Sequence, residues 1–199
     1  ASKTLSLYES ILTKISQHLA QQCAGDKGRL SIPKLDEHQI AAFDYSYLMS
    51  ELNTAKASLE SLEAQLAKGN EAKLEGMLTY FFIAESFHKL FDTVYKRLGE
   101  YGVTADELGA VYGDQEVAAF VSEGLSSQFA EQISDLMCSS QPDGANHWLT
   151  DDHQMFRDTF RKYAETEVKP IAEKIHGHDE LIPASVIYGL AEMGCFGLS

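Results

Sequence analysis

The sequence has few basic residues. Sixteen Lys and Arg stand against 30 Asp and Glu in 199 residues, which gives a formal net charge of −14. A surface that binds nucleic-acid phosphates or an anionic membrane needs the opposite sign. No apolar run approaches the roughly 18 residues that a membrane-spanning helix requires. We therefore expect neither nucleic acid nor a membrane as partner. The opening residues 1–15 contain no Arg and read as a helix, so we expect no leader and a cytoplasmic protein.

Cysteine is also scarce. Cys23, Cys138 and Cys195 are odd in number and widely separated, which favours free thiols in a reducing compartment over a disulfide framework or a zinc cluster. Val and Ile are sparse and no stretch alternates polar and apolar residues, so strands are not expected. What the chain does have is a hydrophobic content of 44%, which is typical of a globular protein. The prediction is an all-α fold.

Three helical stripes dominate the first 100 residues. A first helix is followed by a Gly- and Pro-containing loop at 25–36, and Asp36 is expected to cap a second, long helix. The segment KGN at 68–70 ends this helix, and a third helix follows. Such helices with a short connection form an antiparallel long-helix bundle. The apolar positions are Leu5, Tyr8, Ile11, Leu12, Ile15 and Leu19; then Ile40, Phe43, Tyr47, Leu48, Leu52, Ala55, Leu59, Leu62 and Leu66; then Leu74, Met77, Leu78, Phe81, Ala84, His88, Phe91, Tyr95 and Leu98.

Shorter helices follow, with clear start and stop signals. Thr104 and Glu107 form a capping-box pair, Asp114 caps the next helix, and Gly124 marks a break in it. The segment CSSQPDGAN at 138–146 gathers Ser, Pro, Asp, Gly and Asn, as domain boundaries do. We predict two domains joined near residue 143: a helical extension at 1–146 and a second helical domain at 147–199.

Two groups of residues suggest metal binding at first sight. Glu85 and His88 form an E-x-x-H pair on one helix face, but a di-iron bundle needs that pair twice. His88 also continues an apolar stripe, so we interpret it as a hydrogen-bonded core histidine. His176, His178 and Asp179 lie on a glycine-containing connection without a distant third ligand group, which favours a solvated loop. We predict no metal site.

Residues 149–199 carry a more specific pattern. Thr150 begins a helix that contains Pro170, where a proline costs about 3 kcal/mol or forces a kink. Pro183 then begins a second helix, at its first position, and Gly194 caps it. The positions that form the pattern are Phe156–Arg157, Arg161, Tyr163–Ala164 and Pro170 in the first helix, and Leu190, Glu192, Gly194 and Gly197 around the end of the second. This order and spacing resembles the opening of the acyl-CoA dehydrogenase family, including the proline within the helix.

The resemblance implies the first helices of that family's N-terminal α-helical domain. In the family, FAD and a glutamate base that removes the α-proton of an acyl-CoA thioester lie in later domains. We therefore expect a parent enzyme with FAD, an acyl-CoA substrate, an electron-transfer flavoprotein as partner and a homo-oligomeric state. For this chain by itself we expect no catalytic, cofactor-binding or metal-binding residues. The apolar residues Cys195, Phe196 and Leu198 after the last cap also lead us to expect that the chain continues.

Residues 1–146 have no counterpart in ordinary members. They resemble the helical N-terminal extension of the methylsuccinyl-CoA dehydrogenases, a branch of the same family. The alternative is a stand-alone acidic all-helical interaction or scaffold domain without catalysis, which merely shares a helix pair with the dehydrogenases.

Overall fold

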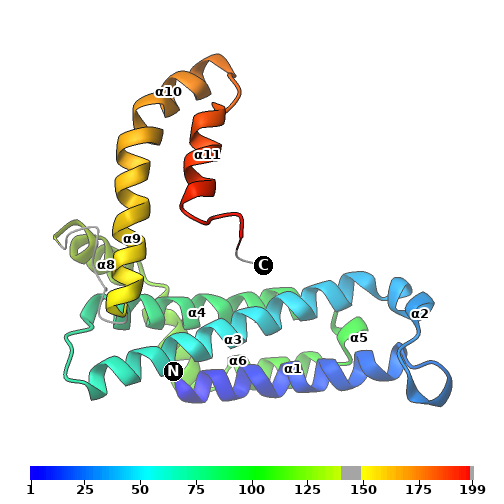
Figure 1. Cartoon of the computed structure of the whole chain (residues 1–199). Coiled ribbons are helices and arrows are strands. Elements are labelled where there is room, and N and C mark those ends of the chain that lie inside the picture. Colours follow the sequence, from blue (N-terminus) through cyan, green and yellow to red (C-terminus); the bar gives the residue numbers. More distant parts are fainter. Residues whose placement is uncertain (140–148, 198–199) are drawn as a thin grey trace. The chain divides into compact units, whose positions relative to one another are not determined.

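The computed structural model describes residues 1–139 and 149–197 (Figure 1). In these ranges the chain forms helices and no strand, apart from one isolated antiparallel bridge between Ala24 and Leu30. The all-α prediction is confirmed. The chain divides into two compact units, Ala1–His147 and Trp148–Ser199, and each is described by itself. Most of the predicted boundary segment at 138–146 lies outside the described residues, but its first residues, Cys138 and Ser139, are helical.

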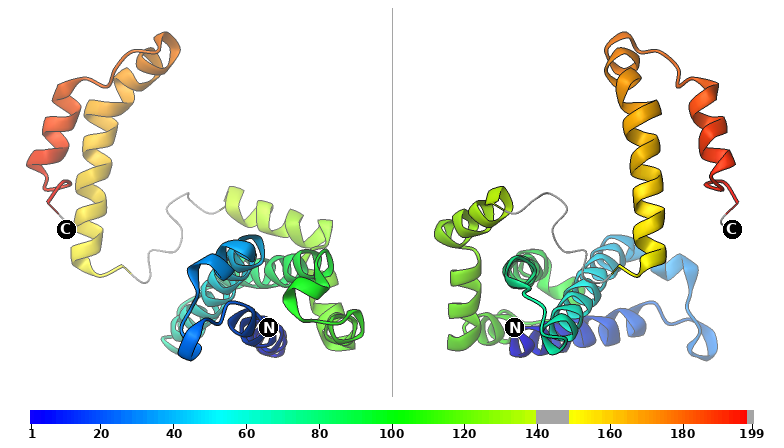
Figure 2. Two further views of the ribbon diagram at one scale, coloured as in Figure 1. Left: turned by 90° about the vertical axis from the view of Figure 1, so that its right-hand side faces the viewer. Right: turned by 60° about the vertical axis from the view of Figure 1, so that its left-hand side comes forward.

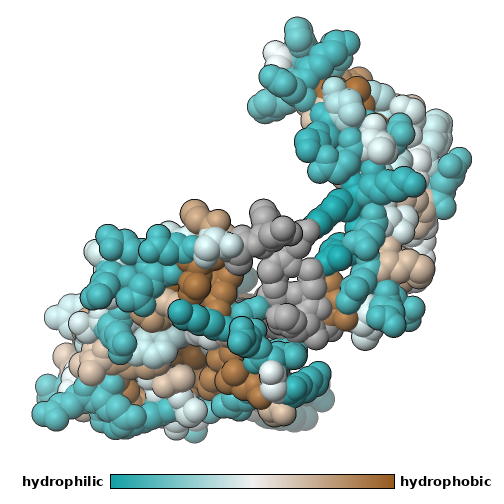
Figure 3. Space-filling model, turned by 90° about the vertical axis from the view of Figure 1, so that its left-hand side faces the viewer, coloured by the Kyte–Doolittle hydropathy of each residue, from teal (hydrophilic) through white to brown (hydrophobic). Residues whose placement is uncertain are grey.

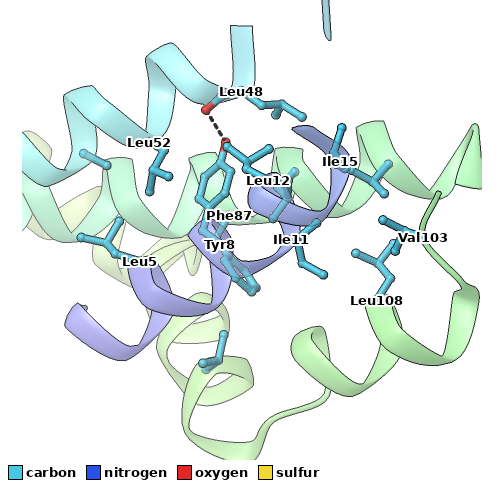
Figure 4. Close-up of a cluster of buried hydrophobic side chains, with 14 of the residues drawn as sticks. Leu5, Tyr8, Ile11, Leu12, Ile15, Leu48, Leu52, Phe87, Val103 and Leu108 are labelled. Carbon is cyan, nitrogen blue, oxygen red and sulfur yellow. Dashed lines mark hydrogen bonds between the residues drawn. The ribbon is translucent and has the colours of Figure 1, made fainter. Parts of the chain in front are cut away.

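Three long helices build the first unit: α1 (Ser2–Gln22), α3 (Gln39–Ala67) and α4 (Lys73–Tyr95). They lie side by side in Figure 1, and α3 and α4 run antiparallel. The predicted face of α1 is the buried one, from Leu5 to Leu19. Tyr8 is fully buried, its hydroxyl donates to the Leu48 carbonyl oxygen at 3.2 Å, and its ring meets Phe87 edge-on (Figure 4). This cluster is the centre of the core.

The predicted faces of the other two long helices are partly wrong. In α3, Leu48, Leu52 and Ala55 are buried as expected. The exposed members of the predicted stripe are Ile40, Phe43, Tyr47 and Leu66. In α4 only Ala84 of the predicted stripe is among the buried residues, which are Thr79, Ile83, Ala84, Ser86, Phe87, Leu90 and Val94. The reason is that α4 is apolar on more than one face, so its periodicity allows two rotations about the axis, and packing against α1 and α3 selects one.

The connection between α1 and α3 is more helical than predicted. The expected loop contains a short 3₁₀ turn, η1 (Asp26–Gly28), and a six-residue helix, α2 (Ile32–Glu37). Asp36 therefore lies inside α2 and does not cap α3, which begins after His38. Pro33 accounts for the difference, because its fixed φ suits the first turn of a helix. The stop at 68–70 is confirmed, with Gly69 at φ +78°.

Within residues 1–139, four shorter helices follow α4: α5 (Leu98–Tyr101), α6 (Ala105–Tyr112), α7 (Gln115–Gly124) and α8 (Ser127–Ser139). The predicted third helix ends at Tyr95, before Arg97 leaves helical geometry. The capping box of Thr104 and Glu107 is present, and the Asp114 side chain accepts from two backbone N–H groups. The break at Gly124 separates α7 from α8. Local capping chemistry thus predicted these ends correctly.

The second unit is a helical hairpin. Its first arm consists of α9 (Asp151–Tyr163), a π-helical turn η2 (Ala164–Val168) and α10 (Lys169–His178); its second arm is α11 (Ala184–Glu192). Both views of Figure 2 show the two arms side by side. The Thr150 cap is confirmed, and the wide π turn directly before Pro170 accommodates the proline that an unbroken α-helix would not. Pro183 is the residue before α11, one position earlier than predicted.

Candidate functional site

The Glu85–His88 pair does not form a site. Glu85 is exposed, and the His88 side chain is 45% exposed, so the prediction of a core histidine is wrong. The prediction that it is hydrogen-bonded is confirmed, since Nδ1 lies 2.7 Å from the Tyr112 hydroxyl. Its Nε2 lies 3.7 Å from an Asp92 carboxylate oxygen. His88 therefore links α4 to the end of α6 at the surface.

His176, His178 and Asp179 end a helix. The predicted loop position is wrong for the two histidines, which lie in the last turn of α10. His178 Nδ1 lies 2.9 Å from the Lys174 carbonyl oxygen. Asp179 follows in the left-handed region, with φ +52°, and the Glu180 N–H donates to the Ile175 carbonyl oxygen. These side chains are exposed, and an imidazole in the last turn of a helix can bond a backbone carbonyl group there, as His178 does.

Within 1–139 and 149–197, no three His, Cys, Asp or Glu side chains come together as metal ligands do. The three cysteines are free: Cys23 is buried, Cys138 is exposed and Cys195 is half-buried. In the same ranges no helix is long and apolar enough to cross a bilayer.

Three groups of the first unit, Tyr8, Tyr101 and Glu107, have clearly shifted pKa values and serve packing. Burial raises the pKa of the Tyr8 hydroxyl far above its ordinary value, and burial together with a hydrogen bond to Asp44 raises that of Tyr101 to about 12. The Lys14 ammonium, with the Thr104 backbone and hydroxyl, lowers the pKa of Glu107 to about 2. Each of these three groups joins two helices or closes a cap.

Tyr163 and Gly189 hold the hairpin of the second unit together. The Tyr163 hydroxyl donates to the Val186 carbonyl oxygen at 2.9 Å. Its ring lies over Gly189, where a methyl group would approach the ring carbons Cε2 and Cζ to 2.7 Å. Sequence reasoning included Tyr163 in the pattern of the first helix but missed this contact. The available signal was a glycine inside an amphipathic helix, which is unfavourable unless something packs closely against it.

Two open grooves flank this contact. One, of about 360 Å³, lies between α10 and α11. The other, of about 560 Å³, lies between α9 and α11. The first is lined by Val168, Ile171, Ala172, Ile175, His176, Asp179, Glu180, Ile182 and Val186; the second by Thr159, Lys162, Tyr163, Thr166, Glu167, Ser185, Tyr188, Gly189, Glu192 and Met193. Apolar surface dominates both, as in faces that pack against further protein.

The lining of these grooves does not fit a flavin dinucleotide. A diphosphate needs backbone N–H groups at a helix start or several bases. In the larger groove the basic residue is Lys162, and two acids, Glu167 and Glu192, lie in the same lining. In the smaller groove His176 lies with two carboxylates, so the acids outnumber the bases in both. No redox step is assigned to these residues.

The hairpin exposes much of its apolar surface. Among its described residues only Val186 is buried. The exposed large apolar side chains are Met155, Phe156, Leu181, Ile182, Ile187, Tyr188 and Phe196. Figure 3 shows hydrophobic side chains reaching the surface among hydrophilic ones. Patches of this kind mark surfaces that other protein covers. Phe196, one of the apolar residues after the Gly194 cap, is 66% exposed, and Leu198 lies outside the described residues.

Residues 150–199, which contain this hairpin, match the sequence model of the acyl-CoA dehydrogenase N-terminal domain. The chain is thus related to the acyl-CoA dehydrogenases. Over its full length it is also similar to the (2S)-methylsuccinyl-CoA dehydrogenase of Cereibacter sphaeroides, with 28% identity over 211 aligned positions. The alignment covers 100% of this chain and 37% of that enzyme. The similarity therefore includes the long-helix unit as well as the hairpin.

Proposed function

We propose that this chain is the N-terminal part of an FAD-dependent acyl-CoA dehydrogenase, which introduces an α,β double bond into an acyl-CoA thioester. The observation that carries the proposal is the alignment of the whole chain, long-helix unit included, with (2S)-methylsuccinyl-CoA dehydrogenase. Ordinary similarity of helices would not extend through both units. A branched dicarboxylyl-CoA thioester is accordingly the substrate class that we propose for the whole protein.

In this proposal the chain itself supplies no catalytic group. The exposed apolar face of the hairpin supports a packing role, because helices of this kind need a covering layer. The remainder of the protein binds the flavin, supplies the glutamate base and contacts an electron-transfer flavoprotein. The whole protein is a cytoplasmic homo-oligomer. The long-helix unit serves packing and contacts between subunits.

The test compares two proteins: the 199-residue chain and the product of the full reading frame that encodes it. We expect the full product to be yellow with bound flavin and to reduce an artificial electron acceptor when methylsuccinyl-CoA is supplied. The 199-residue chain should show neither property. A flavin-bearing 199-residue chain would contradict the assignment of the cofactor to the remainder. A reading frame that stops at codon 199 would contradict the proposal as a whole and favour an acidic scaffold domain.

A further inference from the structure

We draw no further inference here: the strongest candidate, the exposed apolar face of Ile40, Phe43 and Tyr47 on α3, beside the shallow groove between α3 and α4, carries nothing because nothing in the described residues shows what covers it.

Discussion

Tyr163 of α9 lies against Gly189 of α11 so closely that position 189 has no room for a methyl group. The hydroxyl of the same tyrosine also bonds to the backbone of α11, at Val186. The contact and the hydrogen bond both join α9 to α11, so they tie the two arms of the hairpin together.

Gly189→Ala should therefore loosen the hairpin. We expect a loss of about 1–3 kcal/mol from overpacking, which exceeds the gain of about 1 kcal/mol that alanine brings to a helix. The rate of amide hydrogen exchange along α11 measures this loss of stability. Gly177→Ala is the control: nothing lies within 4 Å of a methyl group there, so it should stabilise α10 by about 0.5–1 kcal/mol. Equal exchange in both variants would contradict a close Tyr163 contact.

Tyr8 predicts a loss of stability in alkali. Its pKa is raised in the folded chain by burial, whereas an unfolded tyrosine ionises near its ordinary value of 10.0. Folding stability is therefore full below pH 10 and falls as the pH rises above it. Tyr8→Phe should lower stability by about 1 kcal/mol at neutral pH, through loss of the bond to Leu48, and should make the alkaline fall shallower. Denaturant titrations between pH 7 and about 11 measure both the stability at neutral pH and its fall in alkali. Tyr188→Phe, at an exposed position, should change neither.

Glu107 predicts the opposite dependence in acid. Lys14 and Thr104 hold its pKa at about 2 in the folded chain, below the ordinary 4.5. Its contribution is present above pH 4.5 and is lost as the pH falls toward 2. Glu107→Gln should lower stability at pH 7 and flatten the dependence over this window, as followed by thermal unfolding. If Glu107→Gln kept the full acid dependence, other carboxylates would be responsible. Glu60→Gln, at an exposed site on α3, should behave like the unchanged chain.

The ends of α10 and α11 form a natural comparison. Both close with a left-handed residue and the same pair of backbone bonds, but the residue is Asp179 in one and Gly194 in the other. Asp179→Gly should raise stability by about 0.5–1 kcal/mol, since glycine adopts a positive φ without strain and an acid is unfavourable at a helix C-terminus. Gly194→Asp should lower it by a similar amount. Thermal unfolding of the two variants checks the signs, and a gain in both would refute the strain argument.

Sequence reasoning succeeded where one or two residues determine the structure. Thr104 with Glu107, Asp114 and Thr150 begin their helices because a side-chain oxygen satisfies free backbone N–H groups, and that chemistry is visible in the sequence. It failed for the faces of α3 and α4, because each of these helices carries apolar residues on more than one face. Phe43 of α3 is exposed and Phe87 of α4 is buried, although both are phenylalanines, because the neighbouring helices determine which face of each helix is covered. The packing of Tyr163 against Gly189 was missed for the same reason, since this contact joins residues that are 26 positions apart in the sequence. The resemblance of the hairpin to a dehydrogenase domain could be recognised because its prolines and glycines have fixed spacings.

The π turn before Pro170 has a consequence for aligning this helix with the corresponding helix of related chains, which can differ in length by one residue. The half-buried positions of the first arm run Phe160, Tyr163, Val168, Ile171 and Ile175, with one step of five residues, while the intervening Ala164 is exposed. In a regular α-helix five residues rotate about 500°, which would carry Val168 well off the face. The wide turn absorbs one additional residue, so homologous chains one residue shorter between 164 and 168 could keep the same hairpin with an unbroken helix. An alignment gap at this place would record a change in winding, and not the loss of a structural element.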